Sequence, residues 1–153
     1  MKIGVPKEIK SQENRIGLTP ESVKILTSNG NEVLVENNGG FEAGFYNEQY
    51  KSAGAKILDK AEDIFDDAEI IVKVKEPQPS EVKMIKENQI VFTYLHLAAA
   101  KELTKGLVDS KSVCIAYETV TDNNGRLPLL APMSAVAGRM SVQAGAHCLE
   151  KNQ

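Results

Sequence analysis

The sequence lacks both a long apolar run and an excess of basic charge. No stretch approaches the roughly 18 consecutive apolar residues that a membrane helix needs, which excludes a membrane-spanning protein. The 18 basic residues are outnumbered by 21 acidic ones, and they form no stripe with interleaved aromatic side chains. Nucleic acid is therefore excluded as a partner.

Cysteine is scarce, and the amino terminus lacks the apolar length of a signal peptide. The two cysteines, Cys114 and Cys148, do not have the spacing of metal ligands. We expect both to be buried packing residues in a reducing compartment, and we predict no metal site. The opening M-K-I-G-V-P-K-E reaches dense charge too early for a secretory signal, so we expect a cytoplasmic protein.

A glycine-rich phosphate-binding motif is also missing. No G-x-G-x-x-G follows any strand-like segment, and Gly39-Gly40 with Gly44 does not match that spacing. The sequence therefore predicts no dinucleotide site of its own.

What is present is the pattern of an ordinary α/β domain. Short apolar runs alternate with helix-like segments, and a length of 153 residues suffices for a sizeable core. Thr19-Pro20-Glu21 is typical of a helix start, and Gly30 of its end. We expect strands at 2–5, 31–36, 55–58, 69–74, 90–95 and 113–117, and further helices at 47–53, 60–65, 80–86, about 99–108 and from 132 to the last residue.

This alternation favours right-handed crossovers between parallel strands. The predicted fold class is α/β, with a mainly parallel sheet that carries helices on both faces. The arrangement is Rossmann-like or flavodoxin-like, and it ends in a long helix.

The most informative stretch is Q-I-V-F-T-Y-L-H-L-A-A-A, residues 89–100. It sets His96 directly after an apolar strand, at the edge of an α/β sheet where ligands bind. An imidazole with an unperturbed pKa of about 6.5 exchanges protons near neutrality. Two interpretations remain open: His96 is a proton donor and acceptor, or it caps the strand and bonds to backbone.

Other polar residues follow other strands. Arg15 lies in the loop after the first strand, Lys75 follows the strand 69–74, Glu118 follows the last strand, and Tyr94 precedes His96 by two residues. An arginine fork grips a carboxylate, a lysine polarises a carbonyl oxygen, and a histidine protonates that oxygen. Together they fit a 2-oxo or 2-amino acid.

Simpler interpretations exist for each residue. Arg15 could be a solvated loop arginine beside nearby glutamates, and Lys75 could pair with Glu76 at the surface. Glu118 could serve only to hold Lys75 in place, and His147 in the last helix is expected to be structural. The interpretation as a site depends on all of these residues meeting at one edge.

Several motifs resemble those of one known family. The opening M-K-I-G-V-P-K-E-I-K-S-Q-E-N-R-I-G-L-T-P closely resembles the amino terminus of alanine dehydrogenases, and nicotinamide nucleotide transhydrogenases open similarly. I-I-V-K-V-K-E-P, F-T-Y-L-H-L-A-A and L-P-L-L-A-P-M-S-A-V-A-G-R-M also match, in order and spacing. The histidine of Y-L-H-L favours the alanine dehydrogenase branch, because transhydrogenases do not keep it.

The resemblance implies reversible, NAD-dependent oxidative deamination of L-alanine to pyruvate and ammonium. It assigns Arg15 to the substrate carboxylate, Lys75 to the carbonyl oxygen and His96 to proton transfer. Tyr94 and Met133 would line the pocket. Ser134 would touch the nucleotide.

Family members are more than twice as long as this chain. The resemblance therefore implies that residues 1–131 are the first part of a substrate domain. Residues 132–153 would begin a connecting helix toward a nucleotide-binding domain that holds most of the NAD site. That helix carries an apolar stripe and a face of small residues that includes Gly138 and Gly145. We expect self-association through it, as the family enzymes are usually homohexamers.

Three functions remain under consideration. The first is the substrate-binding half of an alanine dehydrogenase, inactive in hydride transfer alone. The second is a transhydrogenase-like domain, which His96 disfavours. The third is a non-catalytic module that binds a small 2-oxo or 2-amino acid, and a purely structural module would leave the predicted cluster without a reason.

Overall fold

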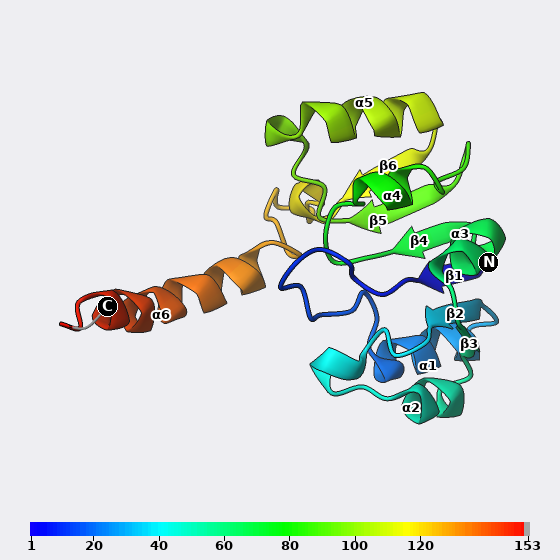
Figure 1. The fold of residues 1–153 in the computed structure, drawn as a ribbon, viewed down its shortest axis with the longest axis horizontal. Helices are drawn as coiled ribbons and strands as arrows, with labels where there is room; N and C mark the ends of the chain where they lie inside the picture. The colour runs from blue at the N-terminus through cyan, green and yellow to red at the C-terminus, as the bar shows by residue number, and fades with distance from the viewer. Residues whose placement is uncertain (152–153) are drawn as a thin grey trace. The chain divides into compact units, whose positions relative to one another are not determined.

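The computed structural model describes residues 1–151 of the chain. The chain divides into two compact units, Met1–Ala116 and Tyr117–Gln153. The first unit contains the sheet and most of the helices, and the second contains the long helix α6, Ala131–Cys148 (Figure 1).

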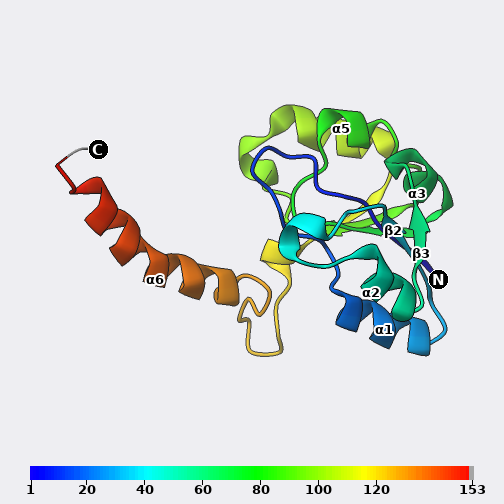
Figure 2. The same ribbon diagram turned by 60° about the horizontal axis from the view of Figure 1, so that its bottom comes forward.

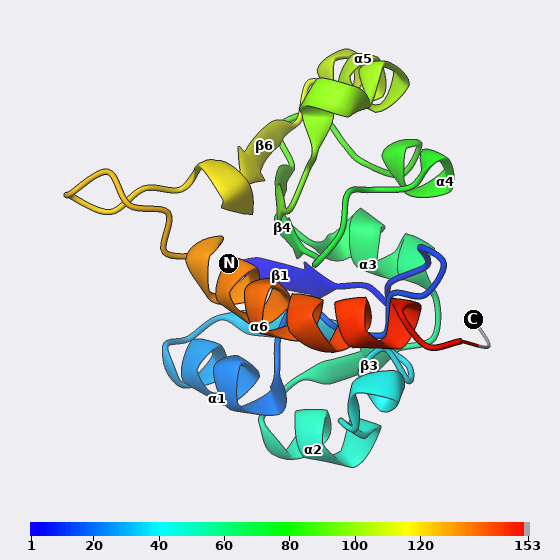
Figure 3. The same cartoon turned by 90° about the vertical axis from the view of Figure 1, so that its left-hand side faces the viewer.

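Six parallel strands form one sheet in the first unit, in the order β3-β2-β1-β4-β5-β6. Figure 3 shows β6, β4, β1 and β3 following one another down the sheet. The strands are β1 (Lys2–Val5), β2 (Glu32–Glu36), β3 (Lys56–Leu58), β4 (Ile70–Val72), β5 (Ile90–Thr93) and β6 (Val113–Ala116). The predicted parallel α/β fold is confirmed.

Helices cover both faces of this sheet, as the sequence predicted (Figure 2). Helices α1 (Pro20–Ser28) and α2 (Asn47–Ser52) pack on one face through Val23 and Tyr50. Helices α3 (Ala61–Asp67) and α5 (Lys101–Ser110) pack on the other through Phe65 and Leu107. The single-turn helix α4 (Pro79–Val82) lies beside α5.

The central strands are apolar on both sides, which is typical of a parallel sheet covered by helices. In β2, Val33 and Val35 belong to the core beneath α1 and α2, while Leu34 belongs to the opposite core. Gly4 of β1 faces α3, where an added Cβ would lie 2.6 Å from Ile64 Cγ2. Glycine therefore lets α3 sit close against the middle of the sheet.

The strand order creates a switch point between β1 and β4. The chain leaves β1 toward β2 on one side, and it leaves β4 toward β5 on the other. Loops that diverge from neighbouring strands open a crevice at the carboxyl edge, which is the usual ligand position in such sheets. Residues 6–19 follow β1 here, and residues 73–78 follow β4.

Some predicted boundaries were wrong. The strand expected at 69–74 ends at Val72; beyond it the Lys73 amide still donates to the Phe92 carbonyl oxygen, but the Val74 amide donates to the Glu8 carboxylate. The helix expected at 99–108 becomes a 3-10 turn, η2 (Leu97–Ala99), followed by α5. The last helix starts one residue early and ends at Cys148, where Leu149 is the C-cap residue.

The expectation that both cysteines are buried was also wrong. Cys114 is half-buried in the edge strand β6, and Cys148 is exposed, since α6 buries none of its residues. Among residues 1–151 no helix is long and apolar enough to cross a bilayer. Within the same range, no group of three or more histidine, cysteine or acidic residues could hold a metal ion.

Candidate functional site

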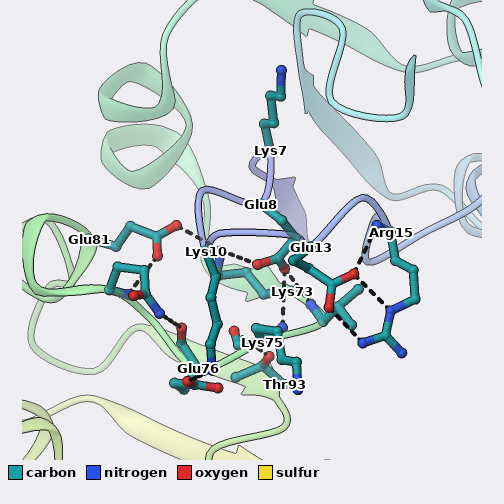
Figure 4. Close-up of polar contacts among 12 residues, drawn as sticks. Lys7, Glu8, Lys10, Glu13, Arg15, Lys73, Lys75, Glu76, Glu81 and Thr93 are labelled. Carbon is teal, nitrogen blue, oxygen red and sulfur yellow. Dashed lines mark hydrogen bonds and ion pairs between the residues drawn. The ribbon is translucent and has the colours of Figure 1, made fainter. Parts of the chain in front are cut away.

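The candidate site lies where the loops after β1, β4 and β5 meet. The loop 6–19 is held close to β4, because Ile16 is buried and an added Cβ on Gly17 would lie 2.5 Å from the Val72 carbonyl oxygen. This contact brings Arg15 toward the end of β4. Figure 4 shows Arg15, Lys75 and Thr93 projecting in the same region, from three different segments.

Arg15 forms a two-pronged pair with Glu13. Arg15 Nε and Nη2 donate to the two carboxylate oxygens at 2.8 and 2.6 Å, and the Arg15 amide donates to Oε1 at 2.9 Å. The Glu13 side chain is 7% exposed and that of Arg15 49%. Arg15 is therefore not a disordered surface arginine; its guanidinium plane is fixed at the rim of the site.

The pKa values of Glu13 and Arg15 are shifted by their hydrogen bonds to each other and by nearby groups. The hydrogen bond from Arg15 lowers the pKa of the Glu13 carboxyl, and the charge of Lys75 lowers it further. The hydrogen bond to Glu13 raises the pKa of Arg15, with a smaller contribution from Tyr94. Lys75 and Tyr94 thus lie close enough to act electrostatically on the Arg15–Glu13 pair.

Lys75 is fixed through its backbone. Its amide donates to Glu8 Oε1 at 3.3 Å, and its carbonyl oxygen accepts from Thr93 Oγ1 at 2.9 Å. The alternative that Lys75 pairs with Glu76 is not what the structure shows, because the Glu76 carboxylate pairs with Lys10.

The Glu76 carboxylate is held by Lys10. Burial alone would raise the pKa of the Glu76 carboxyl, but the hydrogen bond from Lys10 and the charge of His96 outweigh burial and lower it. Oxygen Oε2 of Glu76 is buried without a hydrogen-bond partner among the described residues.

The strand expected at 90–95 ends at Thr93, so His96 lies three residues beyond the carboxyl end of β5 rather than directly after the strand. Its backbone is left-handed, with φ 51° and ψ 37°, which is uncommon for a residue other than glycine. Its ring is stacked on Tyr94, with centroids 6.2 Å apart. The side chain is exposed, and it makes no cap hydrogen bond to η2. The choice between proton transfer and strand capping stays a prediction.

A buried ionic cluster beneath these residues was missed by the sequence analysis. Lys73 Nζ lies 3.1 Å from Glu8 Oε2 and 2.7 Å from Glu81 Oε1, and all three side chains are at most 2% exposed (Figure 4). Burial raises the pKa of the Glu81 carboxyl, although the charge of Lys73 opposes it. We call Glu8, Lys73 and Glu81 the buried triad.

Two signals could have located part of the triad. Side chains of a strand alternate, so Lys73 shares the inward face with the buried Ile71. Q-P-S-E is a capping-box pattern, and Glu81 Oε2 indeed accepts from the Gln78 amide at 2.7 Å. The part played by Glu8 had no local signal, because its partners lie 65 or more residues away.

The remaining predicted residues belong to the second unit. Glu118 lies in the 3-10 turn η3 (Tyr117–Thr119), and Met133 and Ser134 lie in the first turn of α6. The Ser134 amide donates to the Leu130 carbonyl oxygen at 3.2 Å. The roles predicted for these three residues stay predictions. The other four predicted residues, Arg15, Lys75, Tyr94 and His96, all belong to the first unit.

This cluster can bind a small anion and exchange a proton with it. Arg15 and Lys75 supply two cations, and His96 supplies an imidazole, a group that can accept or donate a proton. Tyr94 is 6% exposed, and its ring stacks on that of His96.

Known proteins similar to this chain belong to one family. The chain matches the family model described as "Alanine dehydrogenase/PNT, N-terminal domain" over residues 4–137. It is 56% identical to an alanine dehydrogenase of Halomonas elongata over 153 residues, and 54% identical to that of Bacillus subtilis over 151. These alignments cover 100% and 99% of this chain, but only 41% and 39% of the relatives.

Solved structures of the same family are also similar to this chain. A structure of L-alanine dehydrogenase matches with a TM-score of 0.94 and 52% identity, covering 100% of this chain and 42% of the other. A transhydrogenase from Sinorhizobium meliloti matches with a TM-score of 0.75 and 25% identity over 81% of this chain and 35% of the other. Since the family model covers most of the chain and relatives more than half identical cover nearly all of it, the chain belongs to the alanine dehydrogenase/PNT N-terminal domain family.

Proposed function

We propose that this chain is the substrate-binding half of an NAD-dependent L-alanine dehydrogenase. The reaction is L-alanine, NAD and water to pyruvate, ammonium and NADH, and it is reversible. The observation that carries the proposal is that Arg15, Lys75 and His96 follow β1, β4 and β5, three neighbouring parallel strands whose carboxyl ends share one edge of the sheet. The family to which the chain belongs supports it.

Each residue has a distinct role in this proposal. Arg15 binds the substrate carboxylate with its guanidinium group, whose plane Glu13 fixes. Lys75 donates to the oxygen of the pyruvate carbonyl and so favours the charge that develops there. His96 takes and returns the proton that the hydroxyl and amine steps require.

Further residues complete the proposed pocket. Tyr94 and Met133 form its walls, Glu118 supports Lys75, and Ser134 contacts the nucleotide. Residues 1–131 contribute the first part of the substrate domain, and residues 132–153 begin the connection to a nucleotide-binding domain. The intact enzyme is a cytoplasmic homohexamer in this proposal.

The described residues do not offer a cradle for NAD. The loop after β1 is long and carries charge where a phosphate-binding turn carries glycines. An added Cβ on Gly39 would meet the Glu36 carbonyl oxygen at 3.0 Å, so this glycine serves chain packing. We therefore assign no hydride-transfer step to this chain, and place most of the NAD site elsewhere in the enzyme.

The first test is a pyruvate titration of the chain. We expect saturable shifts of the His96 ring-proton NMR signals, identified by their loss in His96→Ala. Arg15→Ala should abolish the shifts, because it removes the carboxylate partner. Arg126→Ala removes the same charge from the turn after Asp122, and it should leave the titration unchanged.

Two results would contradict the proposal. One is the absence of any shift at millimolar pyruvate, and the other is an identical titration in Arg15→Ala. A non-catalytic binding module is the second candidate, favoured by the missing NAD cradle. It predicts tight pyruvate binding by this chain alone, and no gain in affinity when an NAD-binding domain of a relative is joined to it.

A further inference from the structure

Both polar groups of the Lys75 backbone are held by side chains from other segments. Glu8 Oε1 accepts the amide hydrogen of Lys75 at 3.3 Å, and also that of Val74 at 2.6 Å. Thr93 Oγ1 donates to the carbonyl oxygen of Lys75 at 2.9 Å. Thr93 of β5 thus binds the carbonyl group of Lys75, and Glu8 of the loop after β1 binds its amide (Figure 4).

The buried triad keeps the Glu8 carboxylate in this position. Glu8 is 6% exposed, and its second oxygen lies 3.1 Å from Lys73 Nζ. Lys73 is in turn bound by Glu81 of α4 at 2.7 Å. A buried carboxylate needs a counter-charge and hydrogen bonds to stay ionised. Lys73 and the two amides provide both, so the acceptor for the Lys75 amide is fixed.

This arrangement sets the distance between the two site cations. Glu8 and Arg15 belong to the same loop, so the bond from Glu8 to the Lys75 amide joins the Arg15 loop to the Lys75 segment. A lysine side chain is flexible, and it reaches a defined point only when its backbone origin is fixed. A substrate with a carboxylate and a keto oxygen needs both points at a set separation.

We propose that Glu8 and Thr93 are positioning residues that fix Lys75 relative to Arg15 for binding of a 2-oxo acid, with Lys73 as the counter-ion of Glu8. The inference rests on the proposed function and deepens it. Neither residue contacts the substrate in this proposal; each acts through the Lys75 backbone.

The test is Thr93→Val, which removes the hydroxyl while keeping the shape of the side chain. The dissociation constant of pyruvate should rise roughly tenfold to a hundredfold, since small misplacements in a binding constellation have effects of this size. Thr93→Ser restores the hydroxyl and should restore most of the affinity. Thr27→Val is the matched control, because Thr27 Oγ1 bonds the Ala53 carbonyl oxygen at 2.7 Å, far along the chain from the site residues.

The outcomes separate positioning from mere stability. Thr93→Val loses the hydroxyl bond to the Lys75 carbonyl oxygen, and Thr27→Val loses those to the Lys24 and Ala53 carbonyl oxygens, so the control should lose at least as much melting temperature. A pyruvate affinity reduced only in Thr93→Val supports the inference. Unchanged pyruvate affinity in Thr93→Val, or an equal reduction in Thr27→Val, overturns it.

A second measurement distinguishes this inference from the proposed function. If the unaltered chain does not bind pyruvate, the proposed function fails. Hydrogen exchange at the Lys75 amide in Glu8→Gln and Thr93→Val then tests, independently of pyruvate binding, whether Glu8 and Thr93 fix the Lys75 backbone. Relative to the unaltered chain, a larger increase in exchange rate at the Lys75 amide than at the Ile71 amide supports the positioning role. An exchange rate at Lys75 that is unchanged in the variants overturns it.

Discussion

Lys73 is the residue whose environment departs most from the usual one for its type. A lysine ammonium group is costly to bury, and here it is 0% exposed between two carboxylates that are each 2% exposed. The triad carries one positive and two negative formal charges, so it tolerates no loss of its cation. We therefore expect substitution of Lys73 by an uncharged residue to destabilise the fold.

Lys73→Met should lower the free energy of unfolding by about 3–5 kcal/mol, because it leaves two buried carboxylates without a counter-charge. Urea unfolding followed by far-UV circular dichroism measures the change. Lys56→Met is the control, since Lys56 pairs with Glu32 while its side chain is 68% exposed, and little change is expected. Equal unfolding midpoints for the two variants would contradict the burial argument.

The Arg15–Glu13 pair predicts an acid dependence of stability. Glu13 has a pKa lowered from its ordinary value of 4.5, chiefly by the hydrogen bond from Arg15. The folded state therefore holds the proton less tightly than the unfolded state. This contribution is complete above pH 4.5, and it is lost as pH falls toward and through the lowered pKa.

Glu13→Gln removes this dependence. The difference in unfolding free energy between the unaltered chain and Glu13→Gln should shrink as pH falls below 4.5. Taking this difference cancels the opposite contribution of Glu81, whose raised pKa is common to both proteins. Urea unfolding at a series of pH values measures it, and a difference independent of pH would be inconsistent with the pair.

At the scale of elements, the sequence predicted the strands well and the loops poorly. Apolar runs such as I-V-F-T mark buried strands without ambiguity, and Thr19 caps α1 as expected, accepting from the Ser22 amide at 3.3 Å. The placement of Arg15, Lys75 and His96 followed from strand ends alone. The hydrogen bond from the Lys75 amide to Glu8 could not be predicted, because it joins residues that are 67 positions apart in the chain.

The loop 6–19 depends on one close backbone contact with β4. Gly17→Ala would place a Cβ 2.5 Å from the Val72 carbonyl oxygen, so the loop has to move away from β4. Arg15 lies two residues before Gly17, and pyruvate affinity should therefore fall together with stability. Titration and urea unfolding of Gly17→Ala measure the two effects.

Gly138→Ala provides the comparison for this substitution. No atom lies within 4 Å of an added Cβ there, and the residue is inside helix α6. It should stabilise that helix by up to about 1 kcal/mol. A Gly17→Ala variant that keeps both full affinity and full stability would disprove the close-contact argument.

At the scale of the whole molecule, the two units differ in what they bury. The unit Met1–Ala116 has a core on each face of its sheet. In the unit Tyr117–Gln153, helix α6 has no buried residue, and apolar side chains such as Val136, Met140 and Val142 are exposed. Apolar surface of this kind favours association.

We therefore expect the chain to self-associate through α6. Sedimentation velocity should show a sedimentation coefficient that rises with protein concentration, and Val136→Glu combined with Met140→Glu should abolish the rise. Glu substitutions at the exposed Lys83 and Lys86 positions serve as controls for added negative charge. A concentration-independent monomer would argue against association through α6.

The ion pair between Glu8 and Lys73 also has a consequence for biosynthesis. The two residues are 65 positions apart. At about 5–20 residues per second, the ribosome adds Lys73 several seconds after Glu8. During that interval the amino-terminal loop has no counter-charge to close upon, and β4 does not yet exist beside β1. The nascent chain therefore closes the loop 6–19 against the end of β4 only after Lys73 has left the exit tunnel, and a chaperone that holds the amino terminus would have to release it by then.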